Sequence, residues 1–197
     1  MSMIINPYFS NLGGCVNVQG LNLQVGTGTT NIFQYPAYGL FNFSWTSMIW
    51  DAAEMAGAKQ ITGIEIEIGG YTVPYTYNNQ TIKLAHLAPA TTTFPTSTPA
   101  IDWSDLSVSN ITAVKTFNWT ISTSGWLVIN FDTPFCYNGT SNLILGWENR
   151  DGSWTSGFGS AESTLITNKG AYANNDPAFP TGNGSRYSYR MNIRFKY

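Results

Sequence analysis

The sequence predicts an all-β fold: a single antiparallel β-sandwich of jelly-roll form with one short helix. Three observations lead to this prediction. Apolar and polar residues alternate with a period of two in several segments, as in strands with one buried face. Clusters of Gly, Pro, Asn and Ser separate about ten such segments. Only one stretch carries the signals of a helix, and it is short.

A chain of 197 residues has the size of one domain. Residues 1–20 are rich in Gly and Asn and have no clear period. We therefore expect an N-terminal arm or edge segment, of the kind that is often ordered only against a neighbouring subunit. The β-sandwich domain is predicted to occupy residues 21–197. It begins with a strand at residues 21–25, where leucine and valine alternate with polar residues.

The next part of the chain is expected to contain an aromatic segment, then a short helix, then a strand. Residues 32–50 are crowded with aromatic side chains, which form either core or a contact surface. A helix of one or two turns is expected at residues 51–57, where Asp51 can cap the start and Glu54 completes a capping box. Residues 61–68 alternate isoleucine with polar residues, which predicts a half-buried antiparallel strand.

The middle of the chain is expected to contain further strands, with one long loop between them. Residues 80–87 read as a strand, and residues 88–100 are rich in Thr and Pro, which indicates a long surface loop. One or two strands are expected within residues 102–124. Shorter strands are expected at residues 154–158 and 163–167.

Residues 125–152 give the strongest structural pattern. Two alternating segments flank Asn138-Gly139, a pair suited to a turn with positive φ, so we expect a hairpin with a buried face. Residues 171–186 are rich in Asn, Gly and Pro and are expected to be irregular. Residues 189–197 alternate again, which predicts a closing strand that pairs near the start of the domain.

Composition excludes several classes of function. Charged residues make up 10% of the chain, so Ser, Thr, Asn, Gln and Tyr must cover its surface. Nine Lys plus Arg and a net charge of −2 argue against nucleic-acid binding. No apolar run is long enough for a membrane helix, so we expect no membrane insertion.

The N-terminus points to a cytoplasmic origin, and the expected state of the cysteines follows from it. The first residues have neither a basic segment nor an apolar run of the kind found in a signal peptide, and Pro7 interrupts the only candidate. Cys15 and Cys136 can pair only if their Cβ atoms meet. In a reducing cytoplasm, two free and buried thiols are the favoured expectation.

No catalytic, cofactor or metal site is predicted. His86 is the only histidine, lies in a strand and has no acid or nucleophile motif beside it, so we interpret it as a structural residue. Glu65 and Glu67 share one face and could form a glycosidase pair, but solvent-facing glutamates are the favoured interpretation. Residues 148–152 are expected to form a turn because they lack the acidic spacing of a calcium loop.

Aromatic residues near turns suggest a surface for a glycan or a protein partner. The candidates are Trp103, Trp154, Tyr172 and Tyr187, because they lie in or beside turn-rich segments where rings can stack on sugars. With seven tryptophans in the chain, a role in the core or at a subunit contact is favoured over a glycan platform.

Several runs together resemble a known module: QVGTGTTNIFQYPAYGLFNFSWTSMIWDAAEM from Gln24, TIKLAHLAPATTTF from Thr81, the residues from Gly125 to about 157, and the terminal MNIRF. They look like a β-sandwich module of surface and secreted proteins of Bacteroidetes, which also occurs in virion proteins of phages that infect such bacteria. The resemblance covers most of the chain and implies a fold more firmly than an activity. It supplies no catalytic residues.

The resemblance and the expected cytoplasmic origin favour a phage virion protein. We expect a non-enzymatic capsid decoration, head-fibre or tail-associated subunit, assembled in the host cytoplasm with other virion proteins or copies of itself. The alternative is a bacterial adhesin or carbohydrate-binding module that is on the cell surface or secreted and has a glycan ligand. No cofactor is implied in either case.

Overall fold

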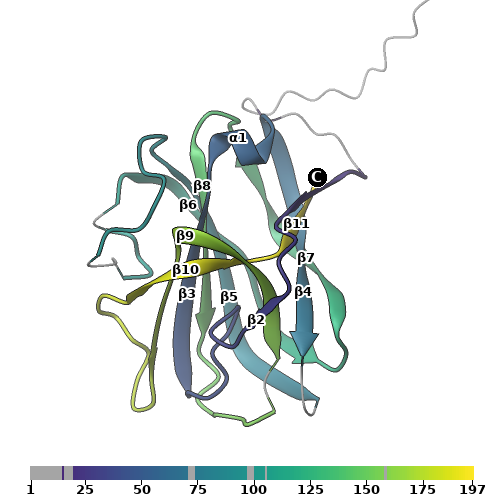
Figure 1. Cartoon of the computed structure of the whole chain (residues 1–197), viewed down its shortest axis with the longest axis vertical. Helices are drawn as coiled ribbons and strands as arrows, with labels where there is room; N and C mark the ends of the chain where they lie inside the picture. The colour runs from purple at the N-terminus through teal and green to yellow at the C-terminus, as the bar shows by residue number, and fades with distance from the viewer. Residues whose placement is uncertain (1–14, 16–19, 71–73, 97–99, 105, 158) are drawn as a thin grey trace, which may run out of the picture.

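The computed structural model describes residues 15, 20–70, 74–96, 100–104, 106–157 and 159–197. Strands dominate it, and Figure 1 shows most of them running along the long axis, with a single short helix at the upper end. The elements are β1 (Asn22–Val25), β2 (Thr30–Ile32), β3 (Phe43–Trp50), α1 (Ala52–Met55), β4 (Lys59–Gly70), β5 (Tyr75–Leu87), β6 (Val108–Ile121), β7 (Gly125–Tyr137), β8 (Asn142–Asn149), β9 (Ser160–Asn175), β10 (Ser185–Met191) and β11 (Ile193–Lys196).

All strand pairs among the described residues are antiparallel, and together they form one connected sheet. Its main path is β1-β11-β4-β9-β3-β8-β5-β6, while β7 pairs with β4, and both β2 and β10 pair with β9. The predicted all-β, antiparallel fold with one short helix is therefore confirmed. The jelly-roll form stays a prediction. No helix of the described residues is long and apolar enough to cross a membrane.

The main core joins the strands that lie on either side of the short pairing between β4 and β9. The two strands pair there only near Ile68 and Gly70, across a register shift. One half of the sheet then contains β4, β7, β11 and β1, and the other contains β3, β8, β5 and β6. Their apolar faces share one cluster of buried side chains, in which the Trp50 ring on β3 contacts Phe195 on β11 with centroids 5.3 Å apart.

A second apolar cluster covers the outer face of the half that contains β3 and β8. Trp45 of β3 and Ile144 of β8 contribute to it, and the segment after β5 closes it with Phe94 and Trp103. Gly146 of β8 makes room for this cover, because a Cβ there would lie 2.7 Å from the Trp103 ring. A glycine at this position therefore lets the indole lie against the sheet.

The predicted hairpin at residues 125–152 is wrong, although its two strands and its turn exist. β7 pairs with β4, whereas β8 pairs with β3 and β5, so the two consecutive strands do not pair with each other. Gly139 has the expected positive φ of 79°. Every residue of β8 is buried, which is what a central strand with a neighbour on each side requires. Long-range burial, rather than the short turn, decides the partners of both strands.

Other local predictions are confirmed or corrected in detail. The closing segment pairs with β1 as expected, with Val25 opposite Ile193, but Asn192 divides it into β10 and β11. In α1 the Glu54 carboxylate accepts a hydrogen bond from the Asp51 backbone N–H at 2.8 Å, as in the predicted capping box. Residues 154–157 form no strand, and the segment predicted to be irregular after residue 171 is still part of β9 as far as Asn175.

Cys15 and Cys136 form a disulfide, so the expectation of two free thiols is wrong. Their Cα atoms lie 5.4 Å apart, although 121 positions separate them in the sequence. This distance is within the usual range for bridged cysteines. Folding places Cys15 against Cys136 of β7. Of the predicted arm at residues 1–20, only Cys15 and Gly20 are described, so the remainder of that prediction lies outside the described residues.

Candidate contact surface

Four half-buried tyrosines form a continuous row of ring contacts. Tyr38 contacts Tyr172 with centroids 6.2 Å apart, Tyr172 contacts Tyr187 at 5.7 Å, and Tyr187 contacts Tyr189 at 5.4 Å. The first two contacts are edge to face, an arrangement that aromatic pairs favour. We call this set the tyrosine row: Tyr38, Tyr172, Tyr187 and Tyr189.

Strand pairing brings the row together. Tyr187 and Tyr189 are two residues apart on β10, so they project to the same side of the strand. Tyr172 lies on β9, where it pairs with Ser185 of β10. Beneath the row, the buried Tyr35 hydroxyl donates to the Tyr189 backbone carbonyl at 2.9 Å, which fixes β10 against the loop after β2.

Tyr187, within the row, is electrically neutral at physiological pH. Burial raises the pKa of Tyr187, and the neighbouring phenols of Tyr172, Tyr189 and Tyr38 raise it further. Burial also raises the pKa of Tyr35 well above its ordinary value. Both hydroxyl groups therefore keep their protons, and the surface offers rings and hydroxyl groups rather than charge.

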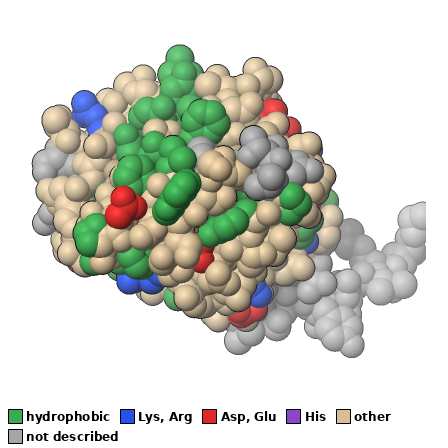
Figure 2. All heavy atoms as spheres, turned by 90° about the horizontal axis from the view of Figure 1, so that it is seen from below, with side chains coloured by type: hydrophobic (Ala, Val, Ile, Leu, Met, Phe, Trp, Pro, Cys, Tyr) green, Lys and Arg blue, Asp and Glu red, His purple; other side chains and the backbone are tan. Residues whose placement is uncertain are grey.

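Exposed apolar side chains gather on loops at one end of the molecule. Phe33 is 54% exposed, Leu40 42% and Trp154 62%. We call these three residues the apolar end. Their loops lie at the lower end in Figure 1, and Figure 2 views that end from below, with hydrophobic side chains across its middle and few charged ones among them.

Backbone hydrogen bonds hold the loops of the apolar end together. The Thr155 N–H donates to the Gly39 carbonyl at 2.8 Å, and the Gly152 N–H donates to the Asn42 carbonyl at 3.0 Å. The Asn42 N–H in turn donates to the carboxylate of Asp176 at 3.2 Å. Residues 33–42, 150–157 and the segment after β9 are thus tied to one another, so the exposed side chains stand on a supported frame.

The four aromatic residues predicted as contact candidates do not share one environment. Trp154 is exposed at the apolar end, and Tyr172 and Tyr187 contact each other in the tyrosine row. Trp103 is fully buried in the second cluster, where its indole N–H donates to the Ser47 hydroxyl at 3.0 Å. Trp103 therefore cannot reach a glycan or a partner. Its prediction as a contact residue is wrong, and it belongs to the core.

A scan against models of known protein families found no match, and a search of curated proteins found none either. The resemblance to a Bacteroidetes and phage module therefore stays a prediction, and the geometry of the surface must carry the functional argument.

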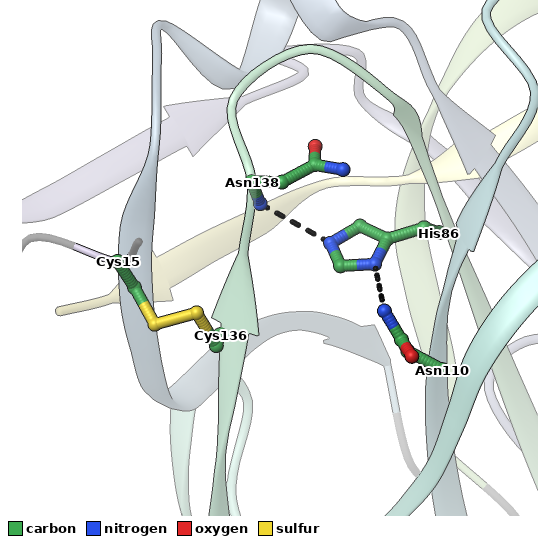
Figure 3. The surroundings of a disulfide bond; sticks show 5 residues. All are labelled: Cys15, His86, Asn110, Cys136 and Asn138. Carbon is green, nitrogen blue, oxygen red and sulfur yellow. Dashed lines mark hydrogen bonds between the residues drawn. A yellow bond between two sulfur atoms is a disulfide. The ribbon is translucent and has the colours of Figure 1, made fainter. Parts of the chain in front are cut away.

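His86 lies beside the disulfide and is held by both ring nitrogens (Figure 3). The Asn138 backbone N–H donates to Nε2 at 3.1 Å, and the Asn110 side-chain amide lies 3.2 Å from Nδ1. Burial lowers the pKa of His86, which keeps the ring neutral, although the Cys136 backbone opposes this shift.

A groove of about 390 Å³ adjoins this histidine, but its lining holds no second group for acid or base chemistry. The other residues around it are Asn110, Thr112, Thr133, Pro134, Phe135, Cys136 and Asn138. Cys136 is already in the disulfide and supplies no thiolate. His86 is therefore packed and hydrogen-bonded, as the sequence predicted.

The predicted carboxylates are engaged in pairs with neighbouring strands. Glu65 is 3.2 Å from the Arg194 guanidinium, and Glu67 accepts a hydrogen bond from the Asn192 amide at 2.8 Å. Of the predicted turn at residues 148–152, the first two residues belong instead to β8, where the buried Glu148 pairs with Lys83 and with Arg150. Among the described residues, no group of three or more His, Cys, Asp or Glu side chains is placed to hold a metal ion.

Sequence reasoning missed two parts of this surface. Tyr38 joins the row from a loop, and only the fold reveals that it lies beside Tyr172. The segment at residues 183–185 also lies against β9 and lines a small cavity with Tyr172. Local patterns assigned this segment to an irregular stretch, and nothing in its own sequence indicates which strand it approaches.

Proposed function

We propose that this protein is a non-enzymatic structural subunit on the outside of a phage virion, such as a capsid decoration, head-fibre or tail-associated protein. It acts by contact with other virion proteins or with further copies of itself, and it contributes to attachment at the host surface. The apolar end is the observation that carries this proposal. Exposed apolar side chains on a supported frame are typical of surfaces that bind a protein partner.

The disulfide supports a location outside the reducing interior of a cell. Such bonds persist on virions, on cell surfaces and in secreted proteins. The neutral, hydroxyl-rich surface also suits a crowded particle exterior. A bacterial cell-surface adhesin or carbohydrate-binding module is the second candidate function, and the tyrosine row favours it because neutral rings can stack on sugars.

Analysis of purified particles distinguishes the two functions. Virions from a lysate of infected host cells are separated on a density gradient and analysed by mass spectrometry. The virion proposal predicts that this chain bands with capsid proteins at a fixed ratio. Its recovery from the surface of uninfected cells, and its absence from the particles, would overturn the proposal in favour of the adhesin.

The role of the apolar end is tested by rebinding. Recombinant protein is added to particles from which it has been removed, and Trp154→Ser is compared with Val128→Ser. Val128 is the matched control because it is 54% exposed on β7 and does not belong to the apolar end. We expect Trp154→Ser to weaken rebinding at least about tenfold, as loss of an interface aromatic typically does, and Val128→Ser to leave it unchanged. Equal rebinding of both variants would show that the apolar end is not the interface.

A further inference from the structure

A small polar cavity lies where β10 separates from β9. Tyr172, Ala173 and Asn174 of β9 line one side, and Asn183, Gly184 and Ser185 line the other, around a volume of about 250 Å³. Ser185 is the first residue of β10 and pairs with Tyr172. Beyond this pair β9 continues beside β3, and the chain returns to the cavity at residue 183.

Gly184 sets how closely the two sides approach. A Cβ at this position would lie 2.4 Å from the Tyr172 carbonyl oxygen and 2.5 Å from the ring of Trp45. Any other residue would therefore push the returning segment away from β9. Because Trp45 is fully buried in the second cluster, the backbone at Gly184 rests on the core of the protein.

The ring of one lining residue, Tyr172, is held in place. The Tyr172 ring contacts Tyr38 at an interplanar angle of 82° and Tyr187 at 80°, so it is braced from two directions. An aromatic group that is already oriented loses little conformational freedom when a ligand stacks on it. The cavity therefore has a closely packed backbone at Gly184 and adjoins a residue whose ring is fixed.

Three polar side chains of the cavity have hydrogen-bonding capacity left over. The side chains of Tyr172, Asn174 and Ser185 make no hydrogen bond to any described residue. Together they offer two hydroxyl groups and one amide, which can donate as well as accept. None of the six lining residues is charged.

We propose that this cavity binds one unit of a neutral saccharide, with the sugar stacked on Tyr172 and its hydroxyl groups bonded to Asn174 and Ser185. An apolar ligand would leave the amide and hydroxyl groups unpaired, and an acidic ligand would find no cation in the lining. A sugar supplies both C–H groups for a ring and hydroxyl groups that donate and accept. The site is separate from the assembly function, because the apolar end and this cavity use different residues. It deepens the second candidate function, carbohydrate binding, and rests on it.

NMR titration of the ¹⁵N-labelled protein tests the proposal. The probes are cellotetraose, maltotetraose and a mannan-derived tetrasaccharide, with tetragalacturonic acid as the charged comparison. We expect at least one neutral probe to shift the side-chain amide signals of Asn174 and Asn183 and the backbone signal of Gly184 in a saturable way. The acidic probe should bind at least about tenfold more weakly.

Substitutions locate the binding. Asn174→Ala and Ser185→Ala should each weaken binding about fivefold, which corresponds to one hydrogen bond, while Ser122→Ala in the exposed turn after β6 should have no effect. These variants leave the braced ring in place, and their spectra report whether the fold is intact. Absence of saturable shifts with every neutral probe would overturn the proposal. So would binding that neither Asn174→Ala nor Ser185→Ala weakens.

Discussion

The ion pair between Arg190 and Glu54 gives the sharpest prediction about stability. Two hydrogen bonds join the guanidinium to the carboxylate, with nitrogen to oxygen distances of 2.6 and 2.9 Å. Arg190 is only 3% exposed and also donates to the Ile49 carbonyl at 2.7 Å. Glu54→Gln removes the charge but keeps an oxygen that can accept the hydrogen bond from the Asp51 N–H of the capping box. The change therefore removes the negative charge that Arg190 and Lys169 share, together with one acceptor of the guanidinium.

The size of the effect follows from the pKa of Glu54. Burial opposes ionisation, but the hydrogen bond and charge of Arg190, the Asp51 backbone and the charge of Lys169 outweigh it and lower the pKa from 4.5 to about 2. At about 1.4 kcal/mol per pH unit, this shift corresponds to about 3 kcal/mol of folding free energy. The Glu54 side chain is 25% exposed, so solvent screening reduces the effect. We expect Glu54→Gln to lose about 2 to 3 kcal/mol at pH 7.

Urea unfolding, followed by tryptophan fluorescence, measures this loss. Because folding lowers the pKa of Glu54, its stabilising effect is complete above pH 4.5 and disappears as the pH falls towards 2. The difference between the wild type and Glu54→Gln should therefore narrow over that range. Asp132→Asn is the control, because its partner Lys115 and its own carboxylate are more exposed, and it should cost less than about 1 kcal/mol. A loss at Glu54 no larger than at Asp132, or one that is the same at pH 7 and pH 2.5, would refute the reasoning.

Three further predictions concern the core, the disulfide and the histidine. Trp103→Ala should cost about 3 to 5 kcal/mol in urea unfolding because the ring is fully buried, whereas Trp154→Ala should change stability by less than about 1 kcal/mol; equal losses would contradict the assignment of Trp103 to the core. Cys136→Ser should cost about 2 to 5 kcal/mol, and a reducing agent should lower the stability of the wild type similarly; a wild type that does not respond to reduction would exclude the bond. Burial lowers the pKa of His86, so thermal stability should fall as the pH drops below 6.5 and the unfolded chain takes up a proton. His86→Gln should weaken this pH dependence of stability. If the variant keeps the same pH profile, groups other than His86 cause the dependence.

Local sequence patterns predict which residues form strands but not which strands pair. The alternation that ends at Ile68 identifies β4, because a period of two records one buried face. The same reasoning located β7 and β8 and the turn at Gly139, yet it paired the two strands incorrectly. Their true partners come from distant parts of the chain, and the complete burial of β8 is a property of the assembled sheet.

Only part of the contact surface could be predicted, because local patterns do not show which distant segments meet. Tyr172 and Tyr187 were identified because they adjoin turn-rich segments, and they do lie together. Trp103 shows the same local features but is buried, because Gly146, on a distant strand, leaves room for its ring. The bond between Cys15 and Cys136 also depends on a contact across 121 positions, which spacing alone cannot reveal.

The covalent link between Cys15 and Cys136 also changes how the protein responds to proteases. It closes a ring of chain that runs from Cys15 through β6 to β7. A single cut anywhere within this ring leaves both pieces joined, so the nicked protein retains its mass until the bond is reduced. A molecule exposed to digestive enzymes outside the cell can thus be cleaved once and still keep its two fragments together.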